Sequence, residues 1–170
     1  MSRYRPPSKP SAPYITHEGR TKLMDELRYL SDTHRPEVTK ALAEAAAEGD
    51  RSENAEYIYR KKQLREIDRR IRYLVKRLEV VKAVDQKPAD QSRVFFGAWV
   101  ELENLGDGEV ERYRLVGADE LDVDNGWISV DSPMARALLK KQEGEEVLVR
   151  RPKGEAAFEI SRVQYEPFTD

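Results

Sequence analysis

The chain contains no cysteine, only two histidines and no long apolar run among its 170 residues. The lack of cysteine excludes disulfide bonds, thiol nucleophiles and thiolate metal sites. No apolar stretch approaches the ~18–20 residues that span a membrane, and no signal-peptide core is present. We therefore expect a cytoplasmic protein with no membrane partner.

Core-forming residues are also in short supply. Hydrophobic residues make up 39% of the chain and charged residues 36%, which fits an elongated helical part better than one compact globule. The apolar residues are nevertheless too periodic for a disordered chain. Residues 1–13 differ from the rest, because four prolines and three basic residues fall there, and we expect this tail to be disordered.

The clearest periodic pattern lies between residues 64 and 81. Apolar side chains recur there at alternating spacings of three and four residues, which is typical of a coiled-coil seam. The seam residues are Leu64, Ile67, Ile71, Leu74, Leu78 and Val81. The pattern predicts a long helix that buries one face against a partner helix.

A matching apolar stripe precedes this helix. It consists of Leu23, Leu27, Leu30, Val38, Leu42 and Ala45. Thr16 is a suitable N-cap for the first helix, and Pro36 predicts a break near His34 because proline lacks a backbone donor. Alanines between residues 41 and 47 permit close approach of the two helices. We expect an antiparallel coiled-coil hairpin over residues 14–87, with its turn at 48–53 and an acidic tip at 48–56.

The pattern becomes strand-like in the second half of the chain. Strands are expected at 94–102, 110–116, 127–130, 147–149 and 158–160. Turn signals at 104–108 and 152–154 indicate two hairpins. Ser132 followed by Pro133 indicates the start of a short helix. Residues 88–170 are therefore expected to form a small α+β domain on an antiparallel sheet.

Charge is distributed unevenly along the chain. Residues 14–87 carry 17 basic and 14 acidic side chains, whereas residues 88–170 carry 10 basic and 18 acidic ones. Five acids and one base fall at 44–56, and nine bases and two acids at 60–77. The predicted hairpin therefore has an acidic tip and a basic stem, a pattern more informative than the net charge of −2.

Asp50 and Glu53 at the expected turn have two compatible interpretations. In the first, they form a capping box, in which Asp50 caps the second helix and Glu53 reaches back to the cap. In the second, both carboxylates point outward from a first helical turn toward a divalent cation. Mg²⁺ is usually held by one or two carboxylates with waters and phosphate oxygens. Two acids make a poor site alone, but they can complete a second-metal position in a site that already holds phosphate.

The basic residues after the tip also have two interpretations. They form either the solvated face of a helix or a surface that contacts RNA phosphates. Soluble helices usually interleave both signs, so the excess of bases favours the RNA contact. The candidates are Arg60, Lys61, Lys62, Arg65, Arg69, Arg70 and Arg72, followed by Lys76 and Arg77. Tyr57 and Tyr59 are candidates for stacking on a base, although Tyr57 also fits the seam.

Four segments together resemble the Gre family of bacterial transcript cleavage factors. They are GDRSENAEY, KKQLREIDRRIRYLVKRLE, VFFGAWVELEN and DSPMARALLKK. The resemblance covers about residues 14–167. It implies that the coiled coil enters the secondary channel of RNA polymerase and that an FKBP-like C-terminal domain docks at the channel rim. The polymerase then cleaves the backtracked RNA whose 3′ end is extruded into that channel.

The resemblance also implies roles for individual residues. Asp50 and Glu53 would help to bind a second Mg²⁺ and orient the attacking water, and the basic stem would contact the extruded 3′ end of the nascent RNA. Asp131, Ser132 and Pro133 would contact the polymerase. We expect a monomer with no cofactor of its own, sharing Mg²⁺ with the polymerase active site, and with no independent nuclease activity.

Three other function classes are weighed against this hypothesis. A Gre-like factor that occupies the channel without cleavage is disfavoured by the intact Asp50 and Glu53. A freestanding metal nuclease needs more ligands than two exposed carboxylates supply. A prolyl isomerase is suggested only by the fold of the C-terminal half, and fold does not confer activity.

Overall fold

The computed structural model describes residues 9–49 and 54–169. Contacts divide the chain into two compact units. Arg20–Val81 form one, and the segment ending at Gly19 together with the residues from Lys82 onward forms the other. Residues 14–19 and 82–87, which the sequence assigned to the hairpin, thus belong to the sheet-bearing unit. In the described part of the chain, no helix combines the length and the apolar character that crossing a membrane requires.

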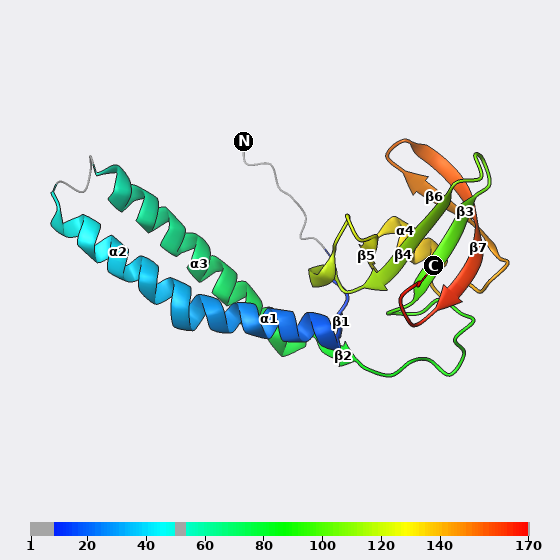
Figure 1. Ribbon diagram of the computed structural model, residues 1–170, viewed down its shortest axis with the longest axis horizontal. Helices are drawn as coiled ribbons and strands as arrows, with labels where there is room; N and C mark the ends of the chain where they lie inside the picture. The colour runs from blue at the N-terminus through cyan, green and yellow to red at the C-terminus, as the bar shows by residue number, and fades with distance from the viewer. Residues whose placement is uncertain (1–8, 50–53, 170) are drawn as a thin grey trace. The chain divides into compact units, whose positions relative to one another are not determined.

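The helical unit is a hairpin of two arms (Figure 1). The first arm comprises α1 (His17–Tyr29), a π-helix (Leu30–His34) and α2 (Arg35–Ala47), and the second arm is α3 (Ala55–Val80). The π-helix lies where a break was predicted. Pro36 falls in the first turn of α2, where a missing N–H is tolerated, and the wider π turn lets the arm continue through the irregularity.

The predicted seam holds the arms together. The buried apolar residues of this unit are Leu23, Val38, Ala45, Ile67, Leu74 and Val81. Two ion pairs cross between the arms, because Arg35 Nε lies 2.7 Å from Asp68 Oδ1 and Arg70 donates two hydrogen bonds to the Glu26 carboxylate. The later residue of one arm pairs with the earlier residue of the other, so the arms run antiparallel, as predicted.

The second unit is built on a five-stranded sheet (Figure 1). Its strands are β3 (Trp99–Asn104), β4 (Val110–Val116), β5 (Trp127–Ser129), β6 (Glu146–Arg151) and β7 (Gly154–Gln164), in the order β5-β4-β3-β7-β6. The short helix α4 (Pro133–Leu138) covers one face. The largest fully buried side chains of this unit are Phe158, Ile15, Leu102, Leu115, Leu138 and Ile160. The α+β class is therefore confirmed.

Two details of the predicted sheet are wrong. The strand expected at 94–102 begins only at Trp99, because the chain turns at Gly97, whose φ of 84° lies in the left-handed region. The sheet is not wholly antiparallel, since β5 pairs parallel with β4. The pattern of apolar residues that marks a strand says nothing about the direction of its neighbour.

A two-stranded parallel pair was not foreseen from the sequence. β1 (Tyr14–Thr16) pairs with β2 (Lys82–Val84) at the two ends of the hairpin sequence. Thr16 is the N-cap of α1, as predicted, and accepts a 3.0 Å hydrogen bond from the Gly19 N–H. Glu120 anchors this cap, because its carboxylate accepts from both the N–H and the hydroxyl of Thr16.

The described residues next to β1 contact the sheet-bearing unit. Ala12 packs against the core of the sheet-bearing unit, and the Pro13 carbonyl accepts a 2.8 Å hydrogen bond from the Lys82 N–H. The pairing of β1 with β2 extends order into this part of the predicted tail. The remaining prediction for residues 1–8 lies outside the described residues.

Candidate functional site

The N-cap of α3 is Asn54, not Asp50. The Asn54 side chain accepts a 3.1 Å hydrogen bond from the Tyr57 N–H, and the helix begins at Ala55. The prediction that Asp50 caps this helix is therefore wrong, and so is the placement of Asp50 and Glu53 in its first turn. Asn54 competes well for this position because asparagine is among the best N-cap residues.

The predicted catalytic pair, Asp50 and Glu53, lies outside the described residues. Both belong to the segment that joins α2 to α3, as the predicted turn requires. Their described acidic neighbours Glu44, Glu48 and Glu56 are all exposed to solvent. The chain therefore carries concentrated negative charge at the closed end of the hairpin.

Several of the predicted RNA-binding bases are engaged in ion pairs. Arg60 Nε lies 2.7 Å from Glu56 Oε1, and Arg70 is bound by Glu26 on the other arm. Lys62 lies 4.0 Å from Glu66. Arg77, at the far end of the stem, is only 9% exposed. These four residues contribute to the hairpin itself, so they are weaker candidates for contact with a partner.

The remaining bases line up along α3. Lys61, Arg65, Arg69, Arg72 and Lys76 follow spacings of four, four, three and four residues, which places them on one face. All five are exposed, and none forms an ion pair with a residue that the structure describes. We call these five residues the basic stripe. It is the part of the stem most available to phosphate groups.

Two tyrosines lie near the tip end of α3, on different faces of the helix. Tyr59 is 57% exposed, and the Arg60 guanidinium lies 5.4 Å from its ring centre. Tyr57 is half-buried, in keeping with its seam position, and the Lys61 ammonium lies 5.7 Å from its ring centre. Tyr59 is therefore the more exposed ring, but it lies on another face beside Lys62 and Arg70, and Tyr57 is the ring next to the basic stripe.

The predicted polymerase contact begins α4. The Ser132 hydroxyl caps this helix by accepting a 3.2 Å hydrogen bond from the Ala135 N–H, and Pro133 occupies the first turn. Asp131 is half-buried, and its Oδ2 accepts a 2.9 Å hydrogen bond from the Ala12 N–H. The structure thus brings the three residues together and adds a partner that the sequence did not predict.

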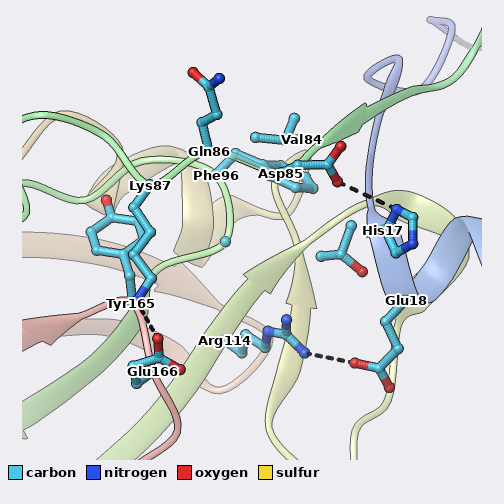
Figure 2. Close-up of a pocket in the computed structure, with 12 residues that line it drawn as sticks. His17, Glu18, Val84, Asp85, Gln86, Lys87, Phe96, Arg114, Tyr165 and Glu166 are labelled. Carbon is cyan, nitrogen blue, oxygen red and sulfur yellow. Dashed lines mark hydrogen bonds and ion pairs between the residues drawn. The ribbon is translucent and has the colours of Figure 1, made fainter.

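The sheet-bearing unit also has an open pocket of about 540 Å³ (Figure 2). Two ion pairs border it, Glu18–Arg114 at 3.8 Å and Lys87–Glu166, and His17 Nδ1 lies 3.6 Å from Asp85 Oδ1. The aromatic rings of Phe96 and Tyr165 complete the lining. The sequence did not predict this pocket, because its residues come from five separate stretches of the chain.

Arg114 also joins an aromatic cluster on the sheet. Its guanidinium lies 5.1 Å from the centre of the Trp99 ring system and 4.5 Å from that of Trp127. Trp99 and Trp127 meet edge to face at 6.3 Å. The three residues occupy one row of β3, β4 and β5. Only the strand register, which the sequence did not reveal, brings them together.

Titratable groups with clearly shifted pKa values cluster at Glu111. Burial and a hydrogen bond to Glu111 raise the pKa of Tyr113 to about 12. Burial opposes ionisation of Glu111, but hydrogen bonds from Arg151 and Tyr113 outweigh it and lower the pKa of the carboxyl. These hydrogen bonds stabilise the sheet. The described residues hold no group of three or more potential His, Asp or Glu metal ligands.

Comparison with known proteins accounts for both units. The family model "Transcription elongation factor, N-terminal" matches residues 13–82, and "Transcription elongation factor, GreA/GreB, C-term" matches residues 88–165. A transcription elongation factor GreB from Xanthomonas axonopodis pv. citri (strain 306) is 59% identical over 165 residues, covering 97% of this chain and 98% of that protein. A GreB from Pseudomonas aeruginosa (strain PAO1) is 58% identical, covering 98% and 99%.

A solved structure is also similar to the chain. The crystal structure of GreA factor homolog 1 from Thermus thermophilus is 27% identical and matches with a TM-score of 0.41, covering 89% of this chain and 97% of that one. The family models and the close relatives together extend over nearly the whole sequence. The chain therefore belongs to the GreA/GreB family of transcription elongation factors.

Proposed function

We propose that this chain is a transcript cleavage factor that acts on backtracked RNA polymerase. Its hairpin enters the secondary channel, and Asp50 and Glu53 reach the polymerase active site. The observation that carries the proposal is the carboxylate pair on the short connection between two antiparallel arms. The capping role that competed for Asp50 is filled by Asn54.

The two carboxylates act as ligands and as orienting groups. Two oxygen donors are too few to hold Mg²⁺ alone, so the ion is shared with the polymerase active site. When bound, it supplies charge stabilisation for phosphodiester hydrolysis. Asp50 and Glu53 add the missing negative charge and orient the attacking water. The factor is accordingly an accessory protein, without nuclease activity on free RNA.

The basic stripe guides the extruded RNA in this proposal. Lys61, Arg65, Arg69 and Arg72 are exposed on one face of α3, and Tyr57 lies one turn before Lys61, with its ring centre 5.7 Å from the Lys61 ammonium. A cationic groove with a stacking platform is the usual way of binding single-stranded nucleic acid without sequence preference. Arg60, Lys62 and Arg70 have intramolecular partners and play a lesser part.

Asp131, Ser132 and Pro133 form the docking element for the channel rim. Pro133 is exposed and Asp131 half-buried, and the capped start of α4 fixes their backbone. A rigid loop that is held by a cap presents its side chains with little loss of conformational entropy on binding.

The test uses a backtracked elongation complex with RNA labelled at either end. Addition of the factor should shorten the 5′-labelled RNA and release a short 3′-labelled fragment faster than the polymerase does alone. Naked RNA under the same conditions should stay intact. Binding without faster cleavage would overturn the proposal and point to a channel-occupying modulator. Cleavage of naked RNA would identify a nuclease instead.

A further inference from the structure

Asn54 bonds to both arms of the hairpin. Its Oδ1 accepts the Tyr57 N–H at 3.1 Å, and its Nδ2 donates a 2.7 Å hydrogen bond to the carbonyl of Ala45 on the other arm. The two bonds use both ends of one amide. They satisfy one of the backbone donors left open at the start of α3 and add a second bond to the Ala45 carbonyl, which also accepts from the Glu48 N–H at 3.3 Å.

We propose that Asn54 is a positioning residue for transcript cleavage, because it fixes the distance between the two helix ends that carry the tip. This inference rests on the proposed function. Asn54 acts through its neighbours and needs no contact with RNA. We call the hydrogen-bonded pair of Asn54 and Ala45 the clamp. Because Asn54 is covalently linked to Glu53, the clamp fixes the point at which the segment with Asp50 and Glu53 joins α3.

Ala45 makes the clamp possible. It is 3% exposed, and its small side chain lets the start of α3 come close enough for a short amide to cross. The clamp also opposes electrostatic repulsion, since five acids and one base fall between Glu44 and Glu56. Without the bond across the arms, like charges would push the helix ends apart.

Asparagine is the residue that this position requires. Aspartate caps a helix as well as asparagine does, but its carboxylate cannot donate to the Ala45 carbonyl and repels it. Asn54→Asp therefore keeps the cap, removes the bond across the arms and adds one negative charge. Asn54→Ala removes both the cap and the bond. Asp68→Asn is the matched control, because it removes the charge of the ion pair with Arg35 farther along the hairpin and keeps an oxygen that can accept from Arg35.

The experiment measures cleavage in backtracked complexes over a range of factor concentrations. In Asn54→Asp we expect the rate at saturating factor to fall about 10- to 100-fold, since misplacing a reacting group by about 1 Å costs on the order of 100-fold. The concentration for half-maximal rate should stay unchanged. Asp68→Asn should match wild type in both quantities.

A spectroscopic readout tests the clamp without cleavage. The chain has no cysteine, so spin labels placed by Glu44→Cys and Ala55→Cys report only the distance between the arms at the tip. Asn54→Asp should broaden this distance distribution in the full-length factor. Asp68→Asn should leave it narrow.

The outcomes separate this inference from the proposed function. Wild-type saturating rates in Asn54→Asp would overturn the positioning role. An equal change in the saturating rate and the half-maximal concentration would also overturn it, by indicating a role in binding or folding. If wild type itself failed to stimulate cleavage, the proposed function would fall, and an unchanged distance distribution in Asn54→Asp would then refute the clamp as well.

Discussion

Asn54 takes the capping position that the sequence had offered to Asp50, and this changes what substitutions at the tip should do. A capping aspartate contributes about 1 kcal/mol to helix stability. Because the cap is provided by Asn54, Asp50→Asn and Glu53→Gln should leave the free energy of unfolding unchanged. Any loss of cleavage in these variants would then arise from the cleavage reaction itself and not from a less stable hairpin.

The catalytic prediction follows from this separation. Asp50→Asn and Glu53→Gln remove anionic oxygens that Mg²⁺ prefers, so cleavage should fall at least about tenfold, the rate change for ~1.4 kcal/mol of barrier. Each variant should still compete with wild type for polymerase, and added Mg²⁺ should partly restore the rate. Wild-type rates with binding intact would contradict the role of both carboxylates.

Asp131 allows a similar separation of docking from chemistry. Asp131→Asn removes the charge but keeps an oxygen that can accept from Ala12. We expect weaker binding to polymerase, with normal cleavage at saturating factor. Ala12→Pro is the control, because it removes the N–H donor and leaves the charge of Asp131 in place. If Ala12→Pro weakens binding as much as Asp131→Asn does, Asp131 serves the fold and not the partner.

The raised pKa of Tyr113 predicts how the free energy of unfolding changes at high pH. An unfolded tyrosine ionises near pH 10, whereas the pKa of folded Tyr113 is raised to about 12 by burial and by Glu111. The folded state therefore binds the proton longer, and this stability is present below about pH 10 and lost as pH rises toward about 12. Urea unfolding of wild type and Tyr113→Phe from pH 8 to 12 should show wild type losing stability more steeply above pH 10. Parallel curves would contradict the shift.

At the scale of the element, the basic stripe distinguishes two uses of charge on α3. Bases with partners on the hairpin hold it together, and bases without such partners among the described residues face solvent. Arg70 belongs to the first group because of Glu26, and Arg65, Arg69 and Arg72 belong to the second. The sequence could count these charges but could not sort them, because the sorting depends on the facing arm.

Neutralising the exposed arginines of the basic stripe should affect RNA binding alone. The triple variant Arg65→Gln, Arg69→Gln and Arg72→Gln should weaken action on long extruded RNA more than on short RNA. The slope of log affinity against log salt should become shallower by up to about 2, at about 0.7 for each phosphate that the variant no longer neutralises. Arg70→Gln is the control and should change that slope less than any arginine of the stripe, because Arg70 is paired with Glu26. Equal reductions on both RNA lengths, without salt dependence, would assign the stripe to folding or docking.

At the scale of the whole molecule, the two units have separate cores. Leu74 is fully buried in the hairpin, and Leu102 is fully buried in the sheet-bearing unit. Both tryptophans, Trp99 and Trp127, lie in the sheet-bearing unit. Tryptophan fluorescence therefore reports that unit, whereas helical circular dichroism reports mainly the hairpin.

Separate cores should give separable unfolding. Leu74→Ala should destabilise the hairpin by about 2–5 kcal/mol, the range for buried leucine truncations. It should lower the transition seen by circular dichroism and leave the fluorescence transition in place, and Leu102→Ala should do the reverse. Val75→Ala, at a residue 42% exposed, should change neither by more than about 0.5 kcal/mol. A single shared transition in all three variants would contradict separate cores.

The sequence by itself determined what depends on local pattern. The seam at Leu64–Val81, the break before Pro36 and the caps at Thr16 and Ser132 all follow from residues close together in the chain. Helical periodicity and capping are short-range effects, so these predictions are confirmed by the structure.

Only the tertiary structure decided what depends on residues far apart. It chose Asn54 over Asp50 as the cap, since the second bond of Asn54 reaches the other arm at Ala45. It paired Arg70 with Glu26 on the facing arm and set the basic stripe on the face of α3 that is exposed to solvent. It also set β5 parallel to β4 and so assembled the tryptophan cluster around Arg114. Each of these outcomes depends on which surfaces pack together, and that choice is made by the whole chain.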